Sequence, residues 1–183
     1  FHANENQTPV AGSIGYIVGG SLKENLRARL TLPPEQVQEG SFVVIESDLW
    51  RFYGLATDLQ LGATDPRFAD EQSEVRLPAS LAAHLHGQTL FTTLEILPAL
   101  MLECGPDPAS PEYAAWRLEH PEDDRPRPIK TIPRHHAAVR LATEGDVAEI
   151  FGQPGKGGNF AIGTTREQGH PVCLDLDRLI LRS

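Results

Sequence analysis

The densest hydrophobic pattern in the chain lies at residues 40–61. Residues 42–46 are almost wholly apolar, which is typical of a buried strand. After a short break, leucines and Thr57 alternate with polar or small residues up to residue 61. Because successive strand side chains point to opposite faces, this run predicts a half-buried strand with one apolar side. Ser47 and Asp48 supply turn chemistry between the two runs, so we expect a central β-hairpin.

Further apolar runs supply the strands that must cover this hairpin, because a hairpin alone is marginal in water. We expect strands at residues 12–18, 22–32, 90–103, 138–142, 159–162 and 172–176. Pro98 predicts a bulge or an edge position, since proline cannot donate to a strand ladder. These short strands are best arranged as a small closed antiparallel β-barrel, because closure removes their exposed edges. The residues expected to face inward include Leu55, Leu59, Val139 and Leu174.

Short helices are expected between some of the strands. A helix is expected at residues 79–86, because a proline precedes this segment and a glycine follows it, as is usual at helix ends. A second helix is expected at residues 113–118. Thr143 and Asp146 resemble a capping box, followed by apolar residues on one helical face and by Gly152 as the stop.

The predicted domain organisation is a flexible N-terminus at residues 1–11 and one barrel domain at residues 12–183. Residues 62–89 form a partly helical insertion. Residues 103–125 form an acidic excursion that is rich in proline. The chain has 183 residues, of which 40% are hydrophobic, and this is enough for a genuine core.

Charge and composition narrow the function classes. The formal net charge of −9 argues against an autonomous duplex-binding protein, because phosphate binding needs a basic face. No run of 18 uncharged apolar residues exists, so we expect no membrane span. No signal peptide is visible, and Cys104 and Cys173 lie far apart in apolar surroundings. We therefore expect reduced thiols and a cytoplasmic location.

Several segments resemble parts of catalytic sites, but none has the complete residue pattern that catalysis requires. The glycine-rich residues 152–158 lack the P-loop pattern, because Lys156 is followed by glycine rather than by serine or threonine. The histidines and cysteines do not follow a zinc spacing. The loop at residues 163–170 offers hydroxyls and charges without an obvious nucleophile and base, so a small hydrolase stays a weaker alternative. We expect no catalytic, cofactor or metal site and no ATPase activity in this chain.

A basic run follows the acidic excursion and could track a nucleic-acid backbone. Its members are Arg125, Arg127, Lys130, Arg134 and Arg140, and two histidines lie among them. No aromatic residue is interleaved, and the preceding acids could neutralise the run. A solvated loop or a contact between subunits is the alternative. The run is also the support for a second hypothesis, a stand-alone small barrel that binds nucleic acid.

Several runs together resemble the N-terminal domain of HerA-type ATPases, the HAS barrel of DNA translocases related to FtsK. They are residues 15–22, 53–58, 65–68, 139–152 and 169–176. The resemblance implies a non-catalytic barrel of a hexameric ring that pumps duplex DNA and works with a NurA-type nuclease in DNA end resection and double-strand break repair. In that family the ATPase core, with its ATP and Mg²⁺, follows the barrel directly. The sequence ends at Ser183 before such a core, so we expect a barrel domain from a longer ATPase.

The barrel of that family is the docking platform for the nuclease, and interfaces favour aromatic and arginine anchors. The loops best able to supply them hold Trp50 and the pair Arg67 and Phe68. We expect these loops to serve two surfaces, one toward the nuclease and one toward a neighbouring barrel or the ATPase core. In the alternative, Trp50 and Phe68 simply cap the barrel core.

Overall fold

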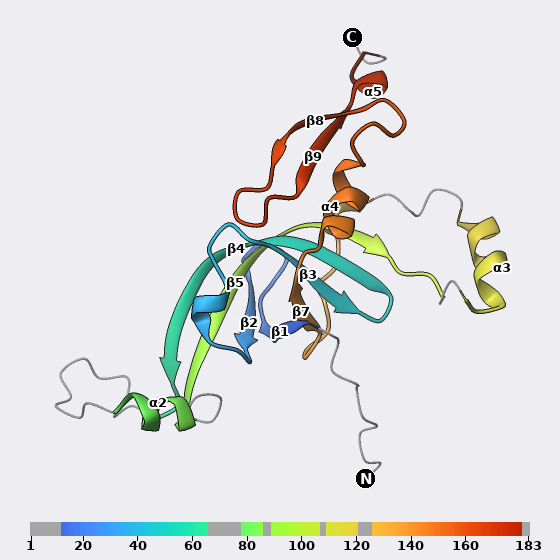
Figure 1. Ribbon diagram of the computed structural model, residues 1–183. Helices are drawn as coiled ribbons and strands as arrows, with labels where there is room; N and C mark the ends of the chain where they lie inside the picture. The colour runs from blue at the N-terminus through green and yellow to red at the C-terminus, as the bar shows by residue number, and fades with distance from the viewer. Residues whose placement is uncertain (1–11, 66–77, 86–88, 107–108, 121–125, 181–183) are drawn as a thin grey trace.

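Six antiparallel strands close into a barrel, which confirms the predicted mainly β fold (Figure 1). The strands lie in the order β2, β1, β7, β3, β4, β5, and β5 pairs back with β2 to complete the ring. Their bounds are β1 (Ser13–Gly19), β2 (Leu26–Leu30), β3 (Phe42–Ser47), β4 (Trp50–Ala63), β5 (Leu90–Glu103) and β7 (Ala138–Leu141). The computed structural model describes residues 12–65, 78–85, 89–106, 109–120 and 126–180.

The other elements lie outside this ring. They are η1 (Pro34–Gln36), α2 (Ala79–Leu85), α3 (Glu112–Glu119), β6 (Arg127–Pro128), α4 (Glu144–Phe151), β8 (Asn159–Thr164), β9 (Pro171–Asp175) and α5 (Leu176–Ile180). In Figure 1 the β8–β9 hairpin and α5 project from the barrel beyond α4, and α2 lies at the far end of the long β4–β5 ribbon. None of the helices in the described part of the chain is long and apolar enough to cross a membrane.

The predicted helices are confirmed, and α4 has the expected capping box. The Thr143 hydroxyl accepts a hydrogen bond from the Asp146 amide, and the Asp146 carboxylate accepts one from the Thr143 amide. Two of the four amides that a helix start leaves without partners are satisfied in this way. Gly152 ends the helix with a φ of 79°, a conformation that favours glycine.

The hydrophobic core has two parts that meet across β3. The first fills the barrel and includes Val43, Ile45 and Phe52. The second lies on the outer wall, where α4 covers Val44 and Tyr53. Because β3 faces the barrel interior on one side and α4 on the other, it is buried on both faces. This explains the almost wholly apolar run that the sequence shows there.

Two bulges change which residues of β4 and β5 face the core. Tyr53 pairs with Leu100 and Gly54 with Pro98, so β5 carries an extra residue beside its proline, as predicted. A Cβ at Gly54 would lie 2.7 Å from the Leu97 carbonyl oxygen, so glycine is needed at this approach. Thr57 is the extra residue on β4.

The β4 bulge corrects the predicted alternation. Before it, Ala56 faces the core and Leu55 lies on the outer face opposite Leu97, so the prediction that Leu55 points inward is wrong. After the bulge the faces exchange, so Leu59 packs against the core. Leu61 lies on the same face, farther along the β4–β5 ribbon, and is 84% exposed. The inward placement of Leu59 is therefore confirmed. A period of two cannot continue through an inserted residue.

The strand predicted at residues 22–32 is shorter than expected. Gly20, with a φ of 130°, opens a turn that occupies the next residues, and Leu22 is exposed. The strand begins at Leu26, where inward side chains first alternate with outward ones. Ala28 is fully buried between the neighbouring strands β1 and β5.

The last predicted strand does not join the barrel. β9 pairs with β8 in a separate two-stranded sheet. β2 and β5 pair with each other and close the ring without β8 or β9. Leu174 is consequently 40% exposed, so the prediction that it points inward is wrong, whereas Val139 is fully buried as predicted.

Leu59 and Leu61 lie on the same face of β4, but only Leu59 packs against the core, so the two should differ in their contribution to stability. Leu59→Ala should lower the free energy of unfolding by about 2 kcal/mol, the low end of the range for a buried leucine, because Leu59 is partly covered. Leu61→Ala, the matched control, should change it by less than about 0.5 kcal/mol. Urea denaturation measures both. Equal losses in the two variants would contradict the packing of Leu59 against the core.

Candidate binding surfaces

An ion-pair network fixes α4 on the outer wall of the barrel. Arg140 of β7 donates to Glu46 of β3 at 2.8 Å and 3.0 Å, and to both carboxylate oxygens of Asp146 at 2.6 Å and 2.8 Å. The fork of the guanidinium suits such bidentate pairing. The Arg140 side chain is 15% exposed and that of Asp146 is 6% exposed. The network therefore links two strands to the first turn of a helix.

The same network shifts the protonation of its members. The hydrogen bonds that Arg140 donates to Asp146, and in addition those to Glu46, raise the pKa of Arg140 despite its partial burial. Burial by itself raises the pKa of Asp146. Hydrogen bonds that Asp146 accepts from Arg140 and Thr143 outweigh burial and lower its pKa to about 2. Asp146 is thus a charged structural group at neutral pH, not a proton donor.

A second branch reaches the exposed side of α4. Arg51 of β4 pairs with Glu46 at 3.4 Å and with Glu149 at 2.9 Å. The Tyr53 hydroxyl donates to the same Glu149 carboxylate. Burial, reinforced by this bond, raises the pKa of Tyr53. A phenol with a raised pKa stays neutral, so this branch also serves structure.

Most of the described residues in the predicted basic run form ion pairs. Arg127 pairs with Glu103 at 2.8 Å, Arg134 pairs with Asp48, and Arg140 belongs to the α4 network. Lys130 is exposed and has no ion pair with a described residue. Arg125 lies outside the described residues. Neutralised arginines attract phosphates weakly, so the structure gives the backbone-tracking hypothesis little support at these positions.

The structure places one of the three predicted partner anchors. Trp50 is the first residue of β4, is half-buried and packs against the barrel core. The Arg127 guanidinium lies 4.9 Å from the centre of its ring, a cation–π contact. This packing favours the capping alternative for Trp50. Arg67 and Phe68 lie outside the described residues, so their role stays a prediction.

The β8–β9 hairpin presents an exposed apolar face that the sequence pattern did not reveal. Phe160 pairs directly with Leu174 across the two strands, and Ile162 lies in a bulge beside them. These side chains are 60%, 40% and 57% exposed, respectively. The opposite face carries the buried Cys173 and lies against α4. An isolated hairpin is marginal in water, so an uncovered apolar face of this kind marks an interaction surface.

Gln168 joins this hairpin to the barrel. Its carbonyl oxygen accepts from the Phe42 amide at 2.9 Å, and its amide donates to the carbonyls of Phe42 and Ala142 at 3.0 Å and 3.1 Å. The His170 ring lies 3.3 Å from the same Ala142 carbonyl. Sequence reasoning treated this loop as a plain connection, because nothing local distinguishes an anchoring glutamine from a solvated one.

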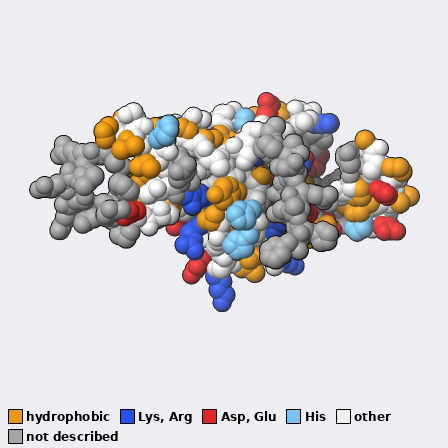
Figure 2. Space-filling view, turned by 90° about the horizontal axis from the view of Figure 1, so that it is seen from below, with side chains coloured by type: hydrophobic (Ala, Val, Ile, Leu, Met, Phe, Trp, Pro, Cys, Tyr) orange, Lys and Arg blue, Asp and Glu red, His pale blue; other side chains and the backbone are white. Residues whose placement is uncertain are grey.

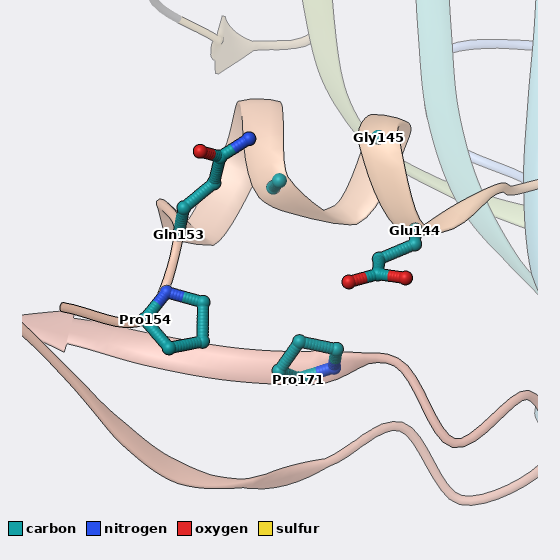
Figure 3. A pocket seen from close by; sticks show the side chains of 6 residues that line it. Glu144, Gly145, Gln153, Pro154 and Pro171 are labelled. Carbon is teal, nitrogen blue, oxygen red and sulfur yellow. The ribbon is translucent and has the colours of Figure 1, made fainter. Parts of the chain in front are cut away.

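A shallow hollow of about 540 Å³ separates α4 from the start of β9 (Figure 3). Glu144, Gly145 and Ala148 line it on the helix side, and Gln153, Pro154 and Pro171 line the rest. One carboxylate and one amide do not form the converging polar set of a catalytic site. Among the described residues, no group of three or more histidine, cysteine or acidic side chains is placed to hold a metal ion. The hollow therefore reflects loose packing of the hairpin.

The comparisons with known proteins do not identify a family. No protein-family model matches the chain, and no curated protein matches it. The closed six-stranded antiparallel barrel is thus the level at which the structure classifies the chain.

Asp146 predicts a specific acid sensitivity. Its pKa is lower in the folded chain than its usual value of 3.8, so its ionised form stabilises the fold above about pH 4. This contribution, on the order of 2 kcal/mol, is lost as the pH falls toward 2. Asp146→Asn should lower the free energy of unfolding at pH 7 by about that amount. In this variant the free energy of unfolding should also fall less steeply as the pH drops from 4 to 2.

Urea denaturation across this pH range measures the effect. Glu144→Gln, which removes an exposed carboxylate from the same helical turn, is the matched control and should behave like the unmodified chain. An unchanged decline in Asp146→Asn would contradict the structural role of the α4 network.

Gln168 predicts a local effect on dynamics. Gln168→Ala removes three hydrogen bonds at the joint, so amides of β8, β9 and Phe42 should exchange with solvent about tenfold faster. Amides of β1 and β2 should keep their rates. Arg166→Ala is the control, because its side chain is 93% exposed. Uniform acceleration throughout the barrel would instead indicate global destabilisation.

Proposed function

We propose that the chain is the non-catalytic barrel domain of a HerA-type DNA-translocating ATPase. In this role it supports assembly of a hexameric ring and docks a NurA-type nuclease, in DNA end resection and double-strand break repair. The proposal takes its family from the resemblance of five runs of sequence. The structure supports the proposal with a closed antiparallel barrel and with an exposed apolar face on the β8–β9 hairpin.

The runs that carry the resemblance fall mostly on elements that touch one another. Residues 15–22 cover most of β1 and its turn, and residues 139–152 cover most of β7 and all of α4. β1 and β7 are paired strands. Residues 53–58 hold both bulge regions of β4, and residues 169–176 hold β9. Similarity concentrated on mutually packed elements supports a shared fold more strongly than scattered matches do.

The apolar face of the β8–β9 hairpin is the observation that supports the role in assembly. In HerA-type proteins the ATPase core follows the last barrel segment, which corresponds here to β9. A neighbouring domain at that point would cover Phe160, Ile162 and Leu174. Burying these three side chains would contribute on the order of 1–2 kcal/mol each at their present exposure.

The nucleotide chemistry of such a parent does not belong to this chain. The glycine-rich residues 152–158 form a turn between α4 and β8, and Lys156 is exposed and followed by Gly157. A phosphate-binding loop would need a hydroxyl there and a position between a strand and a helix. These residues do not fit ATP and Mg²⁺, so we assign the chain no catalytic step.

Disrupting the apolar hairpin face should impair assembly in the protein made from the complete gene. Phe160→Ser combined with Leu174→Ser should lower the fraction of hexamer, because the surface that packs against its neighbour becomes polar. Leu61→Ser, which alters an equally exposed leucine on the β4–β5 ribbon, is the control. Mass photometry measures the assembly state, and circular dichroism checks folding.

Nuclease docking is tested with the same proteins by pull-down of the NurA-type nuclease from the same genome. We expect capture by the unmodified protein and weaker capture by Arg67→Ala/Phe68→Ala. A complete gene that encodes no ATPase core would refute the family proposal. A purified protein that neither forms a ring nor captures the nuclease would refute the docking function.

A further inference from the structure

A row of flat side chains crosses the outer wall of the barrel on β5, β2 and β1. The Arg29 guanidinium lies 4.5 Å from the centre of the Phe91 ring. Arg29 is the register partner of Tyr16 on the next strand. The Tyr16 ring stacks on His136, with ring centres 5.2 Å apart and an angle of 28° between the planes. His135 follows, with its ring centre 6.4 Å from that of His136.

Strand alternation places this row on the outside. Ile17 and Ala28, the neighbours of Tyr16 and Arg29, are buried in the barrel, so the row members point the other way. Tyr16, Arg29 and Phe91 remain half-exposed. The row is therefore a surface feature and not part of the hydrophobic core.

His136 is held in place at a conformational cost. Among the described residues other than glycine, it alone has a positive φ, 61°. Its amide donates to the Ile17 carbonyl at 2.9 Å, and the Ile17 amide donates to the Ala137 carbonyl at 3.0 Å. These bonds to β1 keep the exposed His136 ring against Tyr16. Backbone strain of this kind persists where neighbouring contacts enforce it and often accompanies a functional surface.

Two exposed cations lie beside the row, in a chain with a net charge of −9. Arg27 and Lys23 are exposed, and neither forms an ion pair with a described residue. Two acids lie near them: Glu24 is exposed next to Lys23, and Glu95 lies opposite Arg27, where its carboxylate accepts hydrogen bonds from Asn25 and Gln60. Figure 2 shows histidine side chains in the middle of one face of the molecule, beside a hydrophobic cluster and near Lys, Arg and Asp or Glu side chains.

We propose that this row binds single-stranded nucleic acid, with bases stacked on the flat side chains and phosphates near Arg27 and Lys23. Small barrels and sheets that bind single strands combine such stacking with cationic side chains. Two strand spacings of about 4.8 Å plus the Tyr16–His136 distance span roughly 15 Å, enough for two or three bases.

The geometry favours this ligand over two others. A duplex keeps its bases stacked inside and would use cations without the rings. An acidic peptide would use Arg27 and Lys23 but has no flat groups to match a row of stacked rings. The inference does not depend on membership in the ATPase family, and it uses none of the five basic residues of the run at residues 125–140.

Fluorescence anisotropy with a labelled single-stranded oligothymidine of about 12 nucleotides tests the proposal. We expect measurable binding at low salt that weakens as salt rises, and weaker binding of a blunt duplex of similar length. His136→Gly should reduce affinity about five- to tenfold, since glycine adopts the same positive φ while the stacking ring is lost. Arg27→Gln should reduce affinity and lower the salt slope by about 0.7.

Two matched variants serve as controls. Tyr113→Ala removes a ring that stacks on Trp116 in α3, and Lys156→Gln removes an exposed cation, both away from the row. These should keep the affinity of the unmodified chain. The proposal is overturned if no single-stranded binding is found or if the duplex binds as tightly. It is equally overturned if His136→Gly and Arg27→Gln match the controls, or if polyglutamate competes as well as unlabelled oligothymidine.

Discussion

The pairing of β2 with β5 is the constraint on which the rest of the structure depends. It turns an open sheet into a ring, and it requires β5 to reach β2 on one side while following β4 along its length on the other. A straight strand could not do both, so the bulges beside Pro98 and at Thr57 bend the β4–β5 ribbon. β8 and β9 stay outside this closed ring and pair with each other.

Local chemistry made much of this fold predictable from the sequence. The apolar run of β3, the proline bulge of β5 and the cap at Thr143 each act within a few residues, and each is confirmed. Leu55 and Leu174 were misplaced because their surroundings depend on how the strands pair with one another. An inserted residue on β4 reverses the faces for Leu55, and ring closure elsewhere excludes β9 for Leu174. No short window of sequence contains either fact.

The binding surfaces were harder to predict because they depend on which charges are paired. The arginines at positions 127, 134 and 140 looked available in the sequence, yet each meets a carboxylate from a strand or turn far away along the chain. Arg29 and His136 gave no signal, because their neighbours Phe91 and Tyr16 come together only in the barrel. Acidic residues such as Glu46, Asp146 and Glu103 thus hold arginines that the sequence pattern alone suggested were available.

The outer edge of β4 shows how the molecule limits unwanted association. β3 accompanies β4 only as far as Leu55, and beyond Ala56 the backbone of that edge has no neighbouring strand in the described part of the chain. An open edge invites strand addition by another copy. Here the extra residue Thr57 interrupts the regular spacing of amides, and the exposed charge of Asp58 follows at once. The bulge that bends the barrel therefore also protects this ribbon against edge-to-edge aggregation.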